Sequence, residues 1–165
     1  MNKKPTLYIC IALIAMALSA CNDQTVFVGS KSLEGSWSRF DTAVFEMEVN
    51  DSSSLHDFYI NLRHNKNYRY RNIYLFLHTS YPGGQTVHDT IELILADKQG
   101  EWIGKGMGSI KENDILLRKN FRFPAEGKYI FAIEQGMRKS ALKEGKYLQG
   151  IEDIGIRIER SPEQP

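Results

Sequence analysis

The sequence contains little cysteine and no excess of either charge sign. Cys10 and Cys21 are the two cysteines among 165 residues, which excludes a disulfide-dense scaffold and a four-cysteine zinc site. Lysine and arginine together number 21 against 20 acidic residues, so the formal net charge is +1. Nucleic-acid-binding proteins usually carry a clear basic excess, and we therefore expect no nucleic-acid partner. An apolar content of 42% also excludes disorder as the main state.

A short apolar run near the start of the chain predicts a secretory signal peptide. Lys3 and Lys4 precede a nearly unbroken apolar run over residues 7–18, which is too short for a stable span of ~20 residues. The run ends in Leu-Ser-Ala followed by Cys21, and this ending resembles the bacterial lipobox. The resemblance implies cleavage after residue 20, diacylation of the Cys21 thiol and attachment to a membrane through the lipid.

The predicted cleavage leaves a mature chain with one expected domain. It removes Cys10 and both N-terminal lysines, so the mature protein carries no unmodified cysteine and a net charge of −1. Residues 21–33 contain the lipidated cysteine followed by a polar, aperiodic stretch, which we expect to be a flexible tether. Residues 34–160 are expected to form a single domain, and residues 161–165 are expected to fray.

Alternation of apolar and polar side chains recurs throughout this domain. Within residues 43–49 every second side chain is apolar, which is typical of a strand with one buried face. Similar runs occupy residues 58–63, 73–77, 91–95, 121–123, 129–133 and 154–158. The one helical candidate, residues 137–147, is interrupted by Gly145, and we expect a loop with one helical turn there. The sequence therefore predicts an all-β fold, an antiparallel β-sandwich of jelly-roll type with about eight strands.

Motifs of catalysis, metal binding and phosphate binding are not found. No metal-ligand spacing connects the histidines, which are His56, His64, His78 and His88. There is no G-x-S-x-G nucleophile motif. Residues 104–108 are glycine-rich but lack the strand–loop–helix context of a phosphate loop, and we expect them to bend an edge strand beside Trp102. We therefore expect no enzymatic activity, no metal, no cofactor and no small-molecule substrate.

The most distinctive stretch, residues 62–72, concentrates cations and aromatic rings between two predicted strands. Arginine and tyrosine are enriched at the energetic centres of protein interfaces. One interpretation is therefore a surface that binds a protein partner. The other is a hairpin connection with solvated arginines and half-buried tyrosines, and the sequence does not decide between them. The candidate partner-binding residues are Arg63, His64, Tyr68 and Arg71, together with Arg138 from a second loop.

Four sequence segments, which follow one another in a fixed order, together cover nearly the whole mature chain. They are the lipobox at Cys21; Leu62-Arg63-His64 with Asn72-Ile73-Tyr74-Leu75-Phe76; Asp89-Thr90 with Leu95-Ala96-Asp97, Trp102, Gly104 and Gly106; and Phe123-Pro124, Met137-Arg138, Gly150-Ile151 and Asp153-Ile154-Gly155-Ile156. Together they resemble the GldH family of gliding motility lipoproteins of Bacteroidetes-type bacteria. The resemblance implies a non-enzymatic, lipid-anchored subunit of the gliding apparatus, which is linked in these bacteria to secretion of surface proteins. Its partners would be other envelope proteins of that machinery.

The resemblance also implies a location, and two other functions stay open. The domain is expected outside the cytoplasm, anchored to the cell membrane or the outer membrane, with the periplasm favoured over the cell surface. A carbohydrate-binding lipoprotein is the first alternative, with Trp102, Tyr70 and Tyr81 as candidate sugar-stacking residues. A hydrolase is the second alternative, because paired carboxylates such as Asp89 and Glu92 can cleave glycosidic bonds at a suitable separation.

Overall fold

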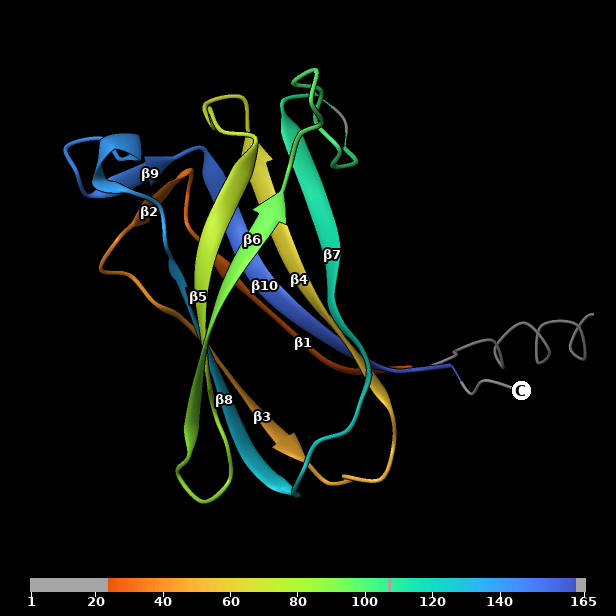
Figure 1. Cartoon of the computed structure of the whole chain (residues 1–165). Coiled ribbons are helices and arrows are strands. Elements are labelled where there is room, and N and C mark those ends of the chain that lie inside the picture. Colours follow the sequence, from red (N-terminus) through yellow and green to blue (C-terminus); the bar gives the residue numbers. More distant parts are fainter. Residues whose placement is uncertain (1–23, 107, 163–165) are drawn as a thin grey trace, which may run out of the picture.

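The computed structural model describes residues 24–106 and 108–162, so the predicted signal peptide and Cys21 lie outside the described residues. Two four-stranded antiparallel sheets pack face to face, and a short two-stranded ladder lies beside one end of the sandwich (Figure 1). The predicted antiparallel β-sandwich is confirmed. No helix in the described part of the chain is long and apolar enough to cross a bilayer.

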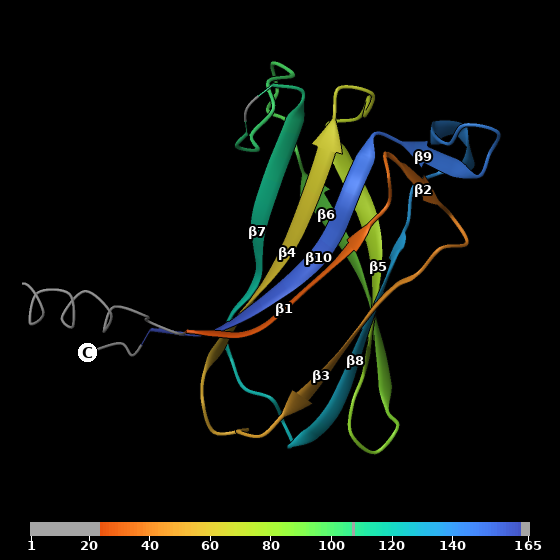
Figure 2. The same cartoon turned by 180° about the vertical axis from the view of Figure 1, so that it is seen from behind.

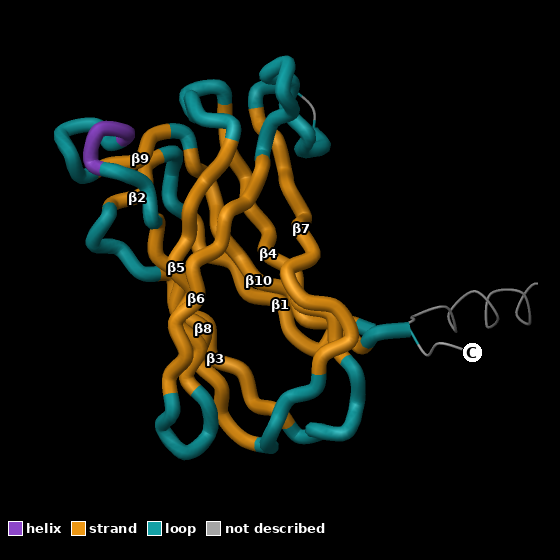
Figure 3. Tube along the Cα trace, viewed as in Figure 1, coloured by secondary structure: helices purple, strands orange, loops and turns teal. Residues whose placement is uncertain are grey.

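Ten strands form these sheets within the described residues. The first sheet has the spatial order β1 (Thr25–Ser32), β10 (Ile151–Arg160), β4 (His56–Asn65) and β7 (Ile110–Phe121). The second sheet has the order β3 (Ala43–Val49), β8 (Gly127–Gln135), β5 (Asn72–Ser80) and β6 (Thr86–Ile94). The ladder joins β2 (Ser36–Ser38) to β9 (Tyr147–Gln149). The number exceeds the expected eight mainly because β2 and β9 are too short to show alternation. Figure 2 shows the first sheet in front, and Figure 3 separates strands from loops.

The core lies between the two sheets and follows the alternation of the sequence. On β10 the side chains of Ile154, Ile156 and Ile158 are fully buried, and on β3 the buried apolar residues alternate with exposed Val44 and two exposed glutamates. Burying each such side chain contributes about 1.5–3 kcal/mol. Trp37 of β2 is also fully buried, and its indole nitrogen donates a hydrogen bond to the Asp41 carbonyl oxygen at 2.8 Å. The ladder therefore covers one end of the core with a satisfied aromatic side chain.

The tether predicted for residues 21–33 is wrong over residues 25–32, which form β1 at the edge of the first sheet. This strand pairs antiparallel with β10 along its whole length. Its half-buried positions are Phe27, Gly29 and Lys31, while Val26 and Val28 face outward, so the usual apolar alternation is reversed. The Lys31 ammonium donates to an Asp41 carboxylate oxygen at 2.5 Å, which joins β1 to the loop between β2 and β3.

The strand predicted at residues 121–123 is also misplaced. The strand, β7, ends at Phe121 and extends back to Ile110. At its end Asn120 has a positive φ of 52°, and its amide donates to the buried Asp57 carboxylate at 2.8 Å. This contact turns the chain, so that Phe123 follows in a loop instead of continuing the strand.

Three further predictions concern two loops and the C-terminal tail. The predicted helical turn is confirmed as a single 3-10 turn at Lys139–Ala141. The glycine-rich segment was expected to bend an edge strand, but residues 104–106 lie outside the strands, and Lys105 forms an isolated bridge with Glu112 at the edge of β7. Fraying from residue 161 is wrong for Ser161, because its amide donates to the Leu55 carbonyl oxygen at 2.8 Å. Residues 163–165 lie outside the described residues.

Candidate functional site

Two of the five predicted partner-binding residues of the folded domain lie in the interior. His64 is 0% exposed and Tyr68 is 1% exposed. The Tyr68 hydroxyl donates to the Asn72 carbonyl oxygen at 2.6 Å, so its polar atom is satisfied inside the protein. The prediction that His64 and Tyr68 contact a partner is therefore wrong, because neither side chain reaches the surface.

His64 and Tyr68 instead form an aromatic cluster at the end of β4. The His64 ring centroid lies 4.4 Å from that of Trp102 and 5.6 Å from that of Tyr68. Tyr70 packs edge-on against Tyr68 at 5.7 Å, and its hydroxyl donates to the Ala141 carbonyl oxygen. Tyr70 and Trp102 are half-buried against the core by these contacts. The carbohydrate-binding alternative is not favoured, because its candidate rings pack against the protein itself.

The remaining candidates are exposed but do not share one surface. Arg63 lies on the outer face of the first sheet, where its guanidinium forms an ion pair with Asp153 at 3.0 Å. Arg138 lies two residues beyond Gly136, whose backbone amide donates to the Tyr74 carbonyl oxygen at 2.6 Å at the end of the second sheet. Arg71 precedes β5, and its carbonyl oxygen accepts the amides of two residues after β6. A partner that contacts Arg63 therefore approaches a different face from one that contacts Arg138.

Burial of His64 and His56 makes the stability of the fold pH-dependent. Desolvation lowers the pKa of both imidazoles below the ordinary 6.5, and His64 Nε2 and His56 Nδ1 have no hydrogen-bond partner in the described structure. Below pH 6.5 the unfolded chain binds protons that the folded chain rejects, so stability falls as pH decreases. Above pH 6.5 this loss disappears. We expect a decrease of at most about 1.4 kcal/mol per pH unit for each histidine.

Urea unfolding at pH 8 and at pH 5.5 measures this effect. The His64→Phe variant keeps an aromatic ring beside Trp102 but cannot take up a proton, so its stability should change less between the two pH values than that of the wild type. The measurement at pH 8 is the control, because residue 64 is uncharged at that pH in both the wild type and the His64→Phe variant. An equal pH dependence in the variant and the wild type would contradict the assignment.

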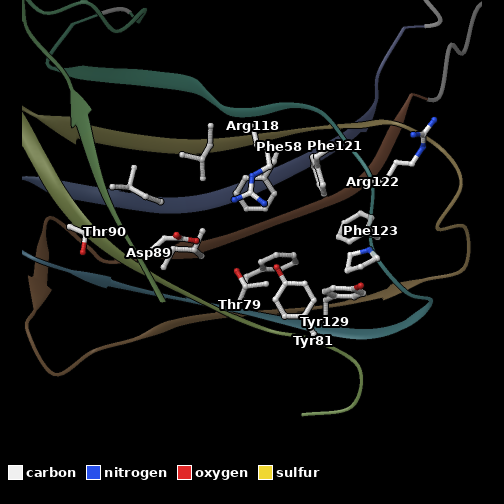
Figure 4. Close-up of a pocket in the computed structure, with 15 residues that line it drawn as sticks. Phe58, Thr79, Tyr81, Asp89, Thr90, Arg118, Phe121, Arg122, Phe123 and Tyr129 are labelled. Carbon is white, nitrogen blue, oxygen red and sulfur yellow. The ribbon is translucent and has the colours of Figure 1, made fainter. Parts of the chain in front are cut away.

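The two long sides of the sandwich differ, and one of them is open. On the closed side β1 lies against β3, and a Cβ atom added to Gly29 would lie 2.7 Å from the Phe45 ring. On the opposite side a cleft of about 280 Å³ opens between the edge strands β6 and β7. Figure 4 shows that side chains from both sheets line this cleft. We take this cleft as the candidate functional site.

Aromatic rings form the interior of the cleft. Phe58 of β4 lies 5.3 Å from Phe131 of β8, so rings from both sheets meet at its floor. Phe123 contacts Phe121 and Tyr129, each at 4.9 Å between ring centroids. The Tyr129 hydroxyl donates to a loop carbonyl oxygen at 2.9 Å, which satisfies its polar atom, and burial raises its pKa. The arrangement suits apolar side chains, because rings pack edge to face with further rings.

Charged side chains stand on opposite walls of the cleft (Figure 4). Asp89 comes from β6, whereas Arg118 lies on β7 and Arg122 on the loop that follows it. Arg118 lies over the Phe121 ring at 6.0 Å, and Arg122 Nε donates to a loop carbonyl oxygen at 2.9 Å. Within the described residues no ion pair joins Asp89 to either arginine. The cleft thus offers an apolar interior with one carboxylate and two guanidinium groups near its opening.

A second hollow, of about 440 Å³, lies on the outer face of the first sheet and is polar. Its central side chain is Arg157, whose guanidinium stacks over the Tyr59 ring at 4.0 Å and forms ion pairs with Asp114 and Glu159. Arg63 and Asp153 form another ion pair beside it. These charges are paired with one another, so the hollow is less suited to a ligand than the cleft.

The cleft could not be predicted from the sequence, because its lining comes from segments that are distant in the chain. Of its lining residues only Asp89 and Tyr81 were named as candidates, and each for a different function. The local signal was the aromatic density near two strand ends, from Phe121 to Phe123 and from Tyr129 to Phe131. That density alone does not show which rings leave space between them.

Comparison with known proteins gives a consistent result. The family model of the GldH lipoprotein matches residues 25–158. A gliding motility lipoprotein GldH homolog of Christiangramia forsetii is 36% identical over 144 residues, covering 87% of this chain and 88% of the relative. The gliding motility lipoprotein GldH of Flavobacterium johnsoniae is 34% identical over 151 residues, covering 91% and 94%. A solved structure of the infectious bursal disease virus VP2 subviral particle aligns with 83% of this chain and 32% of the viral chain at 11% sequence identity. Its TM-score of 0.32 is too low to indicate a shared fold. The chain belongs to the GldH lipoprotein family.

Proposed function

We propose that this protein is a lipid-anchored, non-enzymatic subunit of the gliding motility machinery and of the surface secretion associated with it. The observation that carries the proposal is the family match over residues 25–158, which spans the sandwich from β1 to β10. Both relatives described above are named gliding motility lipoproteins and align over most of their length. The whole folded domain therefore has counterparts in proteins named for this process.

Anchoring through Cys21 is supported by the position of the first strand. Cys21 precedes Thr25 by four residues, which reach at most about 14 Å when extended. Gln24 is held by the fold, because its carbonyl oxygen accepts the amide of Arg160 at 2.7 Å. A lipid on Cys21 would thus hold the end of the sandwich that carries Gln24 and Arg160 close to a bilayer. We propose a location outside the cytoplasm, on the cell membrane or the outer membrane, with the domain in the periplasm.

A role in binding is supported by the chemistry of the cleft. Asp89 is the one carboxylate among its lining residues, and the other charged side chains there are those of Arg118 and Arg122. Arginine stays protonated in proteins, so it holds a polar group but does not exchange protons with it. Paired carboxylates of the kind a glycosidase uses are not brought together there, since Glu92 faces outward on β6. The cleft is thus better suited to binding than to acid–base catalysis.

Exposed apolar side chains on the outer face of the second sheet support contacts with other proteins. Tyr74 and Phe76 of β5 are each 39% exposed, and Val44 and Ile94 are exposed further toward the two edges of the same sheet. Arg138 follows the end of β8 in the same sheet and is exposed. Aromatic residues and arginine are enriched in protein interfaces, so this face is a second surface for envelope partners beside the cleft.

Deletion of the gene in a gliding bacterium tests the proposal. We expect colony spreading and release of surface proteins to be lost and to return when the wild-type gene is supplied on a plasmid. Cell motion under the microscope and the surface protein content are the two measurements. Unchanged spreading and unchanged secretion in the deletion strain would overturn the proposed function.

A further inference from the structure

The open side of the sandwich exposes the edges of two strands. β6 is the last strand of the second sheet and pairs with β5 alone, while β7 is the last strand of the first sheet. The upper part of the β7 edge is occupied at Glu112, which exchanges two backbone hydrogen bonds with Lys105. Below that point the edges of β6 and β7 flank the cleft. Unpaired backbone groups on an edge strand are a template for pairing with another chain.

The hydrogen bonds of β6 show which of its backbone groups face the open side. Tyr81 donates to the Gln85 carbonyl oxygen at one end of the hairpin, and Leu95 donates to the Arg71 carbonyl oxygen at the other. In an antiparallel pair the hydrogen-bonded residues alternate with residues whose backbone groups point the other way. The odd-numbered residues of β6 therefore bond to β5. The residues that direct their N–H and C=O groups toward the open side are Thr86, His88, Thr90 and Glu92.

We propose that an extended segment of a partner protein binds this open side as an additional strand on β6. Side chains of Asp89 and Ile91 turn into the cleft from the same strand, so an added strand would lie along the cleft opening. Alternate residues of that strand point to one face and would enter the aromatic interior. The inference rests on the proposed function, because it names the chemistry of a partner in the contacts proposed there.

The volume of the cleft limits how many side chains of the bound segment can enter it. A cavity of about 150 Å³ holds one benzene molecule, so a cleft of about 280 Å³ has room for two apolar side chains. Residues i and i+2 of a strand supply such a pair, at a spacing of about 6.8 Å. The rings of Phe58, Phe123 and Tyr129 would contact them. We therefore assign to the segment two large apolar residues separated by one residue.

The unpaired backbone groups of β6 and the charged side chains of the cleft favour a protein segment over a lipid as the ligand. An acyl chain fills an apolar space but has no N–H or C=O groups to pair with the β6 edge, whereas a peptide strand satisfies that edge throughout. Arg118 and Arg122 on the opposite wall favour an acidic residue at the next inward-facing position, two residues from the apolar pair. The segment is thus extended, with two apolar residues and one acidic residue at alternate positions that face the cleft.

Peptides with selective backbone methylation test the proposal. The full chain in phospholipid nanodiscs is titrated with a fluorescent nine-residue peptide that carries phenylalanine at two alternate positions, aspartate two residues beyond the second phenylalanine and threonine elsewhere. In a strand, the N–H groups of alternate residues face opposite edges. We expect N-methylation of one alternate set to weaken binding at least tenfold and methylation of the other set to change it less than twofold. Equal binding by both methylated peptides would overturn strand addition.

Variants of β6 and β7 provide the second arm. Thr90→Pro removes an N–H group that faces the open side and leaves the bonds to β5 in place, as proline does on edge strands. The matched variant Thr90→Ala removes the side chain and keeps that N–H group. We expect at least a tenfold weaker complex for Thr90→Pro and less than a twofold change for Thr90→Ala. Leu117→Trp fills the cleft from β7 and should also weaken binding tenfold, with circular dichroism confirming the fold of each variant.

The remaining outcomes separate this inference from the proposed function. Dodecanoate is titrated in the same assay. If it binds, if Leu117→Trp abolishes its binding and if the peptide does not bind, the cleft is a lipid site and the inference fails. The gene-deletion experiment is independent of these titrations, so loss of motility without peptide binding would refute the added strand alone.

Discussion

Replacement of Gly150 by alanine is expected to unfold the domain or to lower its stability by more than about 4 kcal/mol. Gly150 has a φ of 89°, which alanine rarely adopts, and an added Cβ atom would lie 2.1 Å from the Tyr68 backbone nitrogen. The conflict is with backbone, so no side-chain rotation relieves it. The Gly150 amide donates to the Gly35 carbonyl oxygen and its own carbonyl oxygen accepts from Asn65, each at 2.8 Å. A shift of Gly150 would therefore disturb β4, β2 and β10 together.

Gly145→Ala is the matched control for that substitution. Gly145 also has a positive φ, of 67°, but nothing lies within 4 Å of the position its Cβ atom would take. The control therefore carries the backbone strain alone, about 1–3 kcal/mol. Thermal unfolding followed by circular dichroism measures the difference, and we expect Gly150→Ala to melt at least about 10 °C below Gly145→Ala. Melting temperatures within a few degrees of each other would contradict the predicted collision with Tyr68.

Strands with one clearly buried face could be predicted from the sequence. Ala43–Val49 was identified with the bounds that the structure gives, because each inward position is apolar and each outward one is polar or exposed. β1 was missed because its inward positions are Phe27, Gly29 and Lys31, and its valines face outward. A small residue suits that edge, since the Phe45 ring occupies the space beside Gly29. Alternation of apolar and polar residues in the sequence predicts a strand only where each inward position carries its own apolar side chain. It does not predict an edge strand in which the ring of another residue fills the inward space.

The candidate site could be predicted only in part, for a related reason. The stretch from Arg63 to Arg71 alternates cations with rings, and the sequence does not show which side chains turn inward. Packing decides this: His64 and Tyr68 pack with Trp102, which is more than thirty residues away in the chain. The arginines remain exposed because burial of an unpaired guanidinium is costly. The solvated arginines and the half-buried Tyr70 agree with the second interpretation, although the stretch joins strands of two different sheets and not the strands of a hairpin. Binding of a partner by the exposed arginines stays a prediction.

The cleft depends on sheet order, which no local pattern specifies. Its walls come from β6 and β7, the edge strands of different sheets, and its floor includes Phe58 and Phe131 from strands between them. Asp89 was considered beforehand only as an acid beside Glu92. Asp89 and Glu92 lie on opposite faces of β6. The Asp89 side chain turns into the cleft, and the Glu92 side chain turns outward. Knowledge of the strand order was needed to give Asp89 a place in the cleft.

Replacement of Cys21 by alanine is expected to release the protein from the membrane and to abolish its function in the cell, while the sandwich stays intact. The acyl chains proposed on the Cys21 sulfur would supply the attachment, because each buried methylene contributes about 0.8 kcal/mol and two chains anchor stably. Cys21 precedes β1, and the described contacts of the fold begin at Gln24. The variant should therefore show the circular dichroism spectrum and melting temperature of the mature wild-type domain. We expect at least a 100-fold smaller membrane-bound fraction and loss of colony spreading.

Cys10→Ala is the matched control, because Cys10 lies in the predicted signal peptide and would leave with it. Membranes washed with high salt separate lipid-anchored protein from protein held by charge, and mass spectrometry of the N-terminal peptide identifies the acyl groups. The control should remain acylated at Cys21, membrane-bound and active. A free Cys21 thiol in the mature wild-type protein would refute the anchor. Full motility of cells that carry only the soluble Cys21→Ala protein would refute the further claim that attachment confines the domain near its envelope partners and thereby raises their effective concentration.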